Sequence, residues 1–192
     1  MKLLVVGRSA CGKDTLAAIL QNRYNMTFVK SHSTRPPRFE GEDTHVFVSP
    51  EEGRRLLPDA VTWTEINGKL YFAMRETVEA NDAYIIDPKG LFELVKNMPD
   101  TVFAVAYLTA DPAARKQASL GRVPEEEREA ESKVFDARIK AEDAQFRDFE
   151  LMLETGEGLP PNVGWSSIYK NDYTPDGLEK AAEDIAKALG RV

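Results

Sequence analysis

The sequence predicts an α/β fold, a three-layer core in which a parallel sheet is flanked by helices, and two observations lead to this class. The chain opens with an apolar run at residues 2–6, which ends at Gly7 and is followed by a helical pattern at residues 15–20. Three further apolar runs, each followed by a capping residue and a proline, lie at 83–86, 102–108 and 167–169. Strands that alternate with helices are typical of a parallel sheet covered on both faces.

Helix starts are marked by capping residues that directly precede a proline. The cap oxygen accepts a backbone N–H of the first turn, and a proline at the first helical position loses no hydrogen bond. Ser49 and Glu52 also have the spacing of a capping box. Towards the C-terminus we expect a long helix that Gly156 ends, a loop at 156–164 and a final helix. The four cap–proline pairs are Ser49-Pro50, Asp87-Pro88, Asp111-Pro112 and Thr174-Pro175.

Two segments interrupt the alternation of strands and helices. Residues 61–66 and 69–72 flank an Asn67-Gly68 turn and predict a hairpin. Residues 31–73 are therefore expected to form a small mixed α/β sub-domain inserted into the core. Residues 122–131 are charged and poor in apolar side chains, so we expect a mobile exposed loop there.

Composition narrows the classes of function. The chain has 192 residues, of which 42% are hydrophobic, and a formal net charge of −7. This acidic balance argues against general binding to nucleic acids or membrane surfaces, since both require excess positive charge. The single cysteine, Cys11, excludes an intrachain disulfide and a cysteine zinc cage. The opening apolar run is too short for a signal peptide, so we expect a soluble, cytoplasmic protein.

Residues 7–15, GRSACGKDT, match the phosphate-loop pattern G-x-x-x-x-G-K in its required place between a strand and a helix. Backbone N–H groups and the helix N-terminus would surround the phosphates, and Lys13 would reach the β- and γ-phosphates of ATP. The usual hydroxyl ligand of Mg²⁺ is replaced by Asp14, so either that carboxylate or the Thr15 hydroxyl would contact the metal. The alternative is a glycine-rich turn that binds no ligand. The expected nucleotide-binding residues of the loop are Gly7, Ser9, Ala10, Cys11, Gly12, Lys13, Asp14 and Thr15.

A second cationic cluster follows the first helix. Arg35 and Arg38 lie three residues apart beside several hydroxyl groups, with Pro36 and Pro37 favouring an extended backbone. Because the planar guanidinium group suits bidentate phosphate binding, this cluster suggests a second phosphorylated ligand. Taken alone, the cluster would be better explained as two solvated surface arginines.

At this point the chain resembles the guanylate kinase family of nucleoside monophosphate kinases. The resemblance runs in order through most of the chain, from the phosphate loop to Asn171-Asp172. Besides that loop, it rests on Ser31, residues 34–38 (TRPPR), residues 40–42 (EGE), residues 45–47 (HVF), residues 68–71 (GKLY), Asp87, Gly90, Gly121-Arg122 and Arg138.

The resemblance implies a single domain over residues 1–192. Its core would comprise residues 1–30, 74–120 and 155–192, its monophosphate-binding insertion residues 31–73, and its lid residues 121–140. It also implies roles for individual side chains. Arg35, Arg38 and Tyr71 would hold the acceptor phosphate, and Ser31 and Asp87 would lie near the acceptor base. Arg122 and Arg138 would reach the transferring phosphoryl group, and Asn171 would lie near the ATP base.

The chain departs from the family pattern where the acceptor is recognised. His45 stands in place of a phosphate-contacting Tyr, and Thr62 in place of the Glu that reads guanine, while Glu65 matches a neighbouring acid. Base preference and the choice between ribose and deoxyribose therefore stay open. Asp87 also has two interpretations from sequence alone, a water-mediated ligand of Mg²⁺ and a plain helix cap.

Together these observations predict an ATP-dependent, Mg²⁺-assisted kinase that converts a nucleoside or deoxynucleoside monophosphate to the diphosphate. The expected partners are ATP and the acceptor monophosphate, with no nucleic acid or membrane. The protein is expected to be a monomer or homodimer. Alternatives are a non-catalytic interaction module, a kinase of a non-nucleotide acceptor and a nucleotide hydrolase. The expected catalytic residues are Lys13, Arg35, Arg38, Arg122 and Arg138.

Overall fold

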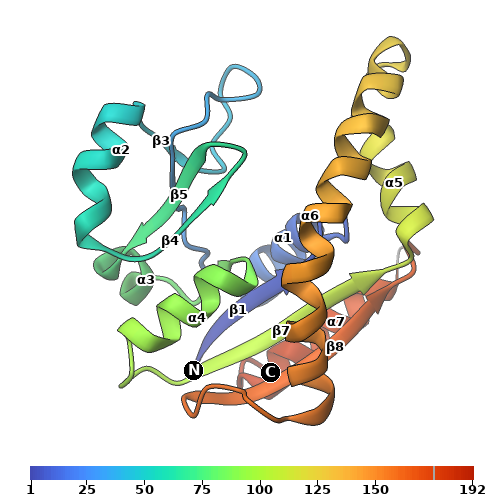
Figure 1. Ribbon diagram of the computed structural model, residues 1–192. Coiled ribbons are helices and arrows are strands. Elements are labelled where there is room, and N and C mark those ends of the chain that lie inside the picture. Colours follow the sequence, from blue (N-terminus) through green and yellow to red (C-terminus); the bar gives the residue numbers. More distant parts are fainter. Residues whose placement is uncertain (175) are drawn as a thin grey trace. The chain divides into compact units, whose positions relative to one another are not determined.

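The structure, a computed structural model, describes residues 1–174 and 176–192 (Figure 1). The helix start expected at Thr174-Pro175 includes a residue outside this description. The chain divides into two compact units, and three strands contribute residues to both: β1 (Lys2–Gly7), β7 (Phe103–Ala110) and β8 (Val163–Asn171). Unit 1 comprises Met1–Leu4, Met26–Ala104 and Pro160–Gly164. Unit 2 comprises Val5–Asn25, Val105–Leu159 and Trp165–Val192.

Among the described residues the strands form two four-stranded sheets, which confirms the expected α/β class. The larger sheet is parallel and has the order β6-β1-β7-β8, with β6 Ala83–Ile85, β1 Lys2–Gly7, β7 Phe103–Ala110 and β8 Val163–Asn171. The smaller sheet is mixed and has the order β3-β2-β5-β4, with β3 Val46–Phe47, β2 His32–Ser33, β5 Lys69–Met74 and β4 Ala60–Ile66.

The smaller sheet lies in unit 1 and contains the predicted hairpin. Strands β4 and β5 are antiparallel, and the turn residues Asn67 and Gly68 both have positive φ, 51° and 69°, as a tight hairpin turn requires. Strand β2 joins the sheet by pairing parallel to β3 and antiparallel to β5. The helical elements of this unit are α2 Pro50–Leu56, η1 Leu57–Asp59, α3 Arg75–Ala80 and α4 Pro88–Asn97.

Three of the predicted helix caps are confirmed by their hydrogen bonds. The Ser49 hydroxyl accepts from the Glu52 amide at 3.1 Å and begins α2. The Asp87 carboxylate accepts from the Gly90 amide at 3.1 Å and begins α4. Asp111 accepts from two amides at the start of α5, Pro112–Leu120, in the same way. In each case the proline occupies the first turn, where its missing N–H costs nothing.

Unit 2 contains a 28-residue helix, α6, that packs against β7. The ring of Tyr107 in β7 lies 6.2 Å from that of Phe146 and 5.9 Å from that of Phe149, both buried on α6. The helix ends at Gly156, whose φ of 74° confirms the predicted stop. The helical elements of this unit are α1 Lys13–Tyr24, α5 Pro112–Leu120, η2 Glu125–Glu127, α6 Arg128–Thr155 and α7 Gly177–Ala188.

The exposed loop expected at residues 122–131 is wrong in extent, because α6 already begins at Arg128. Residues of high helix propensity follow, and the Lys133–Glu129 ion pair at 2.8 Å supports the first turns. The Ser119 hydroxyl of α5 also donates to Glu131 at 2.6 Å. Low apolar content therefore indicated an exposed helix and not an irregular segment. The loop expected at 156–164 is likewise shorter, since β8 begins at Val163.

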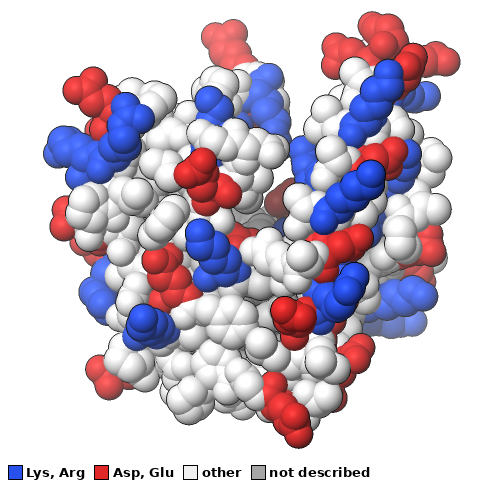
Figure 2. All heavy atoms as spheres, viewed as in Figure 1, with Lys and Arg blue, Asp and Glu red and all other residues white. Residues whose placement is uncertain are grey.

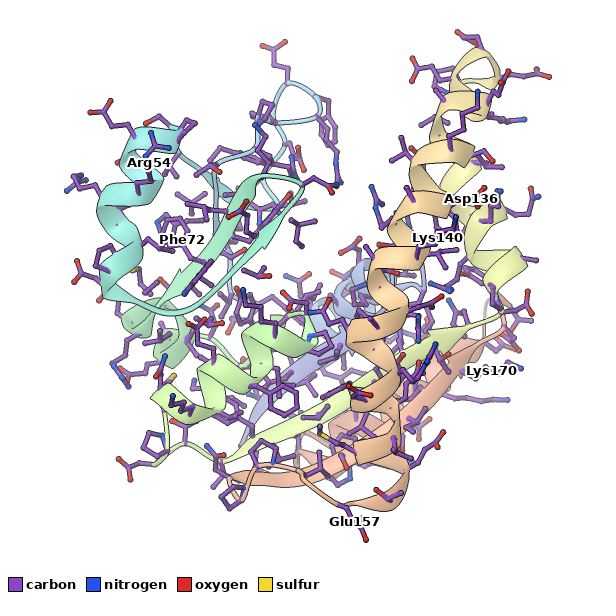
Figure 3. The ribbon with its side chains drawn as sticks, viewed as in Figure 1. Arg54, Phe72, Asp136, Lys140, Glu157 and Lys170 are labelled. Carbon is purple, nitrogen blue, oxygen red and sulfur yellow. The ribbon has the colours of Figure 1, made fainter. Side chains whose placement is uncertain are left out.

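Charged side chains of both signs are interspersed over the face shown in Figure 2. An ion pair joins two helices of unit 2, where Lys116 of α5 contacts both carboxylate oxygens of Asp136 on α6 at 2.8 Å. Asp136 is labelled in Figure 3. Among the described residues, no helix has both the length and the apolar character needed to cross a membrane.

Candidate functional site

The phosphate-loop motif adopts the predicted strand–loop–helix geometry in unit 2. Strand β1 ends at Gly7 and α1 begins at Lys13. A Cβ on Gly7 would lie 2.5 Å from the Leu108 carbonyl oxygen, closer than real Cβ contacts permit. Gly12 has a φ of 101°, and its Cβ would lie 2.6 Å from a side-chain nitrogen of Asn171. Both glycines are therefore required by the close packing of the loop and, at Gly12, by its backbone conformation.

The loop offers hydrogen-bond donors that suit an anion. Gly12 caps α1 without a side-chain hydrogen bond, so the amides of the first turn are left for another acceptor. The Lys13 ammonium donates to the carbonyl oxygens of Gly7 at 2.7 Å and Arg8 at 2.9 Å, which keeps the cation against the loop. Asp14 and Thr15 are exposed on the first turn of α1. This donor set fits the phosphates of a nucleotide.

Two polar side chains, one at the end of β8 and one just after it, hold the loop in place through hydrogen bonds to its carbonyl groups. Asn171, at the end of β8, donates to the Cys11 carbonyl at 3.0 Å and accepts from the Tyr173 amide at 2.8 Å. The Tyr173 hydroxyl donates to the carbonyl of Ala10 at 2.6 Å. Burial raises the pKa of the Cys11 thiol, so the cysteine fills space in the loop. Tyr173 was not identified from sequence, because it lies 163 positions from its partner and belongs to no motif.

Helix α6 supplies acidic side chains to the loop that the sequence did not reveal. The Ser9 amide donates to both carboxylate oxygens of Glu142, at 3.0 and 3.2 Å, and the Ser9 hydroxyl donates to the same group. Arg8 pairs with Asp143 at 2.5 Å and with Glu150 at 3.1 Å. These partners are more than 130 positions apart, and an exposed acidic helix gives no local sign of them.

In unit 1, Arg35 is held by a buried carboxylate. Its two terminal nitrogens donate to the two oxygens of Glu42 at 2.9 and 2.5 Å. Glu42 also accepts from the Arg38 amide at 2.6 Å and from the Thr44 hydroxyl at 2.7 Å. The Arg35 guanidinium holds the pKa of Glu42 well below its ordinary range. The cation also lies over the ring of Phe47, 4.9 Å from its centre.

Three further predicted acceptor residues lie together beside this pair. The Ser31 hydroxyl is 2.9 Å from Nδ1 of His45, and the His45 ring meets the Tyr71 ring edge-on at 5.5 Å. Burial, and next the Arg35 charge, lower the pKa of His45, which keeps the imidazole neutral at pH 7. On the same sheet, Phe72 (Figure 3) stacks on His32 at 4.9 Å. Unit 1 therefore places Ser31, His45, Tyr71 and Arg35 in one polar cluster.

The known proteins that resemble this chain include guanylate kinases. No family model matches the chain. The guanylate kinase of Agrobacterium fabrum is 27% identical over 202 residues, which cover 98% of this chain and 90% of that protein. The guanylate kinase of Brucella melitensis is 28% identical over 155 residues, covering 73% and 69%. A crystal structure of guanylate kinase from Anaplasma phagocytophilum aligns with a TM-score of 0.57 at 18% identity, covering 98% of this chain and 84% of that one.

The chain is a distant homologue of the guanylate kinases. The sequence relationship extends over nearly the full length, and the structural match shows that the fold is shared.

Thr62, which replaces the guanine-reading Glu of the guanylate kinase pattern, is only 1% exposed. Its hydroxyl donates to the Gly90 carbonyl at 2.7 Å, so it is committed to packing β4 against α4. Glu65 and Arg38 are exposed, and Asp87 caps α4 as described above. The structure thus gathers Ser31, His45 and Tyr71 but directs the Thr62 hydroxyl to the backbone.

The two predicted lid arginines lie in unit 2, with Arg122 exposed after α5 and Arg138 half-buried on α6. Across residues 1–174 and 176–192, no three His, Cys, Asp or Glu side chains gather as a metal site. Magnesium in kinases is held by one or two protein oxygens together with water and substrate phosphates, so such a cluster is not required. The assignment of Asp14, Thr15 and Asp87 to the metal stays a prediction.

Proposed function

We propose that the protein is an ATP-dependent kinase that phosphorylates a nucleoside or deoxynucleoside monophosphate. The observation that carries this proposal is the loop at the start of α1. Its first-turn amides have no side-chain cap, and the Lys13 ammonium lies against the Gly7 and Arg8 carbonyls. This is the donor arrangement that phosphoryl-transfer enzymes use for the β- and γ-phosphates. The distant homology to guanylate kinases supports the same activity.

On the donor side, the loop amides and Lys13 would hold the ATP phosphates. Asn171 would act through the loop, because its amide fixes the Cys11 carbonyl. Asp14 or Thr15 would hold Mg²⁺, which when bound would supply positive charge to the phosphates. Arg122 and Arg138 would stabilise charge that develops on the transferring group.

On the acceptor side, Arg35, Arg38 and Tyr71 would bind the monophosphate. The bidentate contact to Glu42 fixes the orientation of Arg35, and the exposed Arg38 supplies a second cation. Ser31 and the neutral His45 would contact the acceptor through hydrogen bonds. Because Thr62 carries no carboxylate and its hydroxyl is already bonded, we expect weaker selection for guanine than a Glu at this position would give.

The phosphate loop is also compatible with a second candidate function, a kinase whose acceptor is a phosphorylated metabolite without a base. The phosphate loop and Lys13 argue against a non-catalytic interaction module, because such a module needs neither. We also propose that the chain is one domain with a core, the insertion at 31–73 and the lid at 121–140, and that it is a monomer or homodimer.

The test is ADP formation from ATP and Mg²⁺ with a panel of ribo- and deoxyribonucleoside monophosphates, and with phosphorylated sugars. We expect acceptor-dependent turnover with at least one nucleotide, and a loss of about 10²- to 10³-fold in Lys13→Ala, the effect of removing a key electrostatic donor. Turnover with sugars alone would establish the second candidate. Equal ATP turnover with and without every acceptor would identify a hydrolase and overturn the proposal.

A further inference from the structure

The side chain of Arg115 is a buried cation beside the phosphate loop whose hydrogen-bonding capacity is poorly used. The residue lies on α5 and is only 3% exposed. Its Nη1 atom is 3.5 Å from the Ser9 carbonyl oxygen and 3.6 Å from a Glu142 carboxylate oxygen, and its buried Nε has no hydrogen-bond partner among the described residues. A guanidinium carries five N–H donors, and burying it costs free energy unless acceptors are close.

The carboxylate of Glu142 lies where an anion would bind to this part of the loop. It accepts from the Ser9 amide and hydroxyl and faces the Arg115 guanidinium. A backbone amide, a hydroxyl and an arginine are the donors that proteins commonly use for phosphate oxygens. The Glu142 side chain keeps 14% of its surface exposed, so it can turn towards solvent.

Neighbouring contacts would keep α6 in place when Glu142 leaves. Asp143 and Glu150 hold Arg8, and the Phe146 ring lies 5.3 Å from the same guanidinium. The Glu142 contact can therefore break without detaching the helix.

We propose that Arg115 is a further phosphate-binding residue, and that the terminal phosphate of a nucleoside triphosphate displaces the Glu142 carboxylate from Ser9 and Arg115. The inference rests on the proposed function. The terminal phosphate is assigned because the Lys13 ammonium contacts the Gly7 and Arg8 carbonyls, next to Ser9, and this lysine type reaches the β- and γ-phosphates. A phosphate has more charge and more acceptor oxygens than a carboxylate, so it uses donors that Glu142 leaves unpaired.

The experiment measures binding of Mg²⁺ with a non-hydrolysable ATP analogue, and separately with ADP, by titration calorimetry. Arg115→Gln is expected to weaken the ATP analogue about 10- to 100-fold, the effect of losing hydrogen bonds to a charged group, and ADP less than about threefold. Arg115→Lys should restore part of the loss. Glu142→Gln keeps an acceptor for Ser9 but removes the competing charge, and should tighten the analogue about fivefold.

The opposite signs of the two variants distinguish this proposal from a structural ion pair. If Glu142 only supported the loop, Glu142→Gln would weaken binding or leave it unchanged, and the proposal would be overturned. Equal losses for ADP and the ATP analogue in Arg115→Gln would also overturn it. Glu129→Gln removes the same charge from an exposed site on α6 and should leave both affinities unchanged.

Thermal melting confirms that each variant is folded, and if Arg115→Gln is not, the sign of the Glu142→Gln effect decides. Absence of ATP binding by the unaltered protein would refute the proposed function and this inference together. Normal ATP binding without the opposite signs would refute this inference alone.

Discussion

Each unit contains an arginine and a glutamate that meet, and the two pairs differ in how completely they are bonded. In unit 1 the Arg35–Glu42 contact is bidentate, and the carboxylate side chain is 1% exposed and accepts two further hydrogen bonds. In unit 2 the Arg115–Glu142 distance is 3.6 Å, and among the described residues both arginines have a buried Nε without a hydrogen-bond partner. The pairs therefore differ in their carboxylates: Glu42 accepts four hydrogen bonds, two of them from its arginine, whereas Glu142 meets its arginine only at 3.6 Å.

This difference indicates two uses of the same residue types. A buried carboxylate with every oxygen bonded fixes the position of its arginine and is lost only at a high cost. A carboxylate that contacts its arginine loosely and reaches solvent can be exchanged for another anion. We therefore expect the Arg35–Glu42 contact of unit 1 to be permanent and the Arg115–Glu142 contact of unit 2 to be replaceable.

The largest loss of stability is expected when the Arg35–Glu42 pair is broken. Glu42→Ala would leave the Arg35 cation buried without its partner, and we expect the free energy of unfolding to fall by about 3 kcal/mol, the lower end for a broken buried pair, because a tenth of the Arg35 side chain is exposed. Glu142→Ala should cost less than Glu42→Ala, because the contact that it removes from Arg115 is already 3.6 Å long. Urea unfolding of both variants measures the difference, and equal losses would contradict the comparison.

Lowering the pH should gradually remove the stability that the Arg35–Glu42 pair contributes. The pKa of Glu42 is lowered in the folded protein, so its contribution is complete above the ordinary glutamate pKa of about 4.3 and is lost as the pH falls through the lowered value. We expect the stability difference between the unaltered protein and Glu42→Gln to stay constant from about pH 7 to pH 5 and to shrink below that. Urea unfolding across this range is the measurement. A difference that begins to shrink near neutral pH would show that the carboxylate is not held by Arg35.

A smaller effect concerns the support of the donor loop. Asn171→Ala removes the hydrogen bonds to the Cys11 carbonyl and the Tyr173 amide, and we expect a loss of about 2 kcal/mol in stability together with several-fold weaker ATP binding. Tyr169→Phe, which removes an exposed hydroxyl from the same strand, is the matched control. If ATP affinity is the same in both variants, β8 does not position the loop.

The smallest expected effect lies at the position of the missing guanine-reading Glu. Thr62→Val removes the hydroxyl that bonds to Gly90, and should lower stability by about 1 kcal/mol without changing the preference among acceptor bases. Thr64→Val, two positions along β4, controls for strand propensity. A changed base preference at unchanged stability would place the Thr62 hydroxyl in contact with the acceptor.

Local patterns predicted the parts of this molecule that depend on neighbouring residues. The strand before Gly7, the caps at Ser49 and Asp87 and the turn at Asn67 each follow from a few adjacent side chains. The carboxylates of α6 could not be found this way. Their sequence is typical of any solvated helix, and only the packing of β7 against α6 brings Glu142 to Ser9.

The same reasoning explains the error at residues 122–131. Sparse apolar side chains indicated that the segment is exposed, which the structure shows, but exposure does not decide between loop and helix. Helix propensity and charge pairs at spacing four decide it, and both favour a helix from Arg128.

The length and continuity of α6 have a consequence for how far along the helix an exchange of anions at Ser9 would act. Arg138 and Glu142 are four positions apart, so they lie one above the other on the same side of the helix. The contacts of Arg8 with Asp143 and Glu150 hold this helix to the loop. Exchange of the Glu142 carboxylate for a triphosphate at Ser9 would therefore move one side chain and leave the backbone at Arg138 where it is.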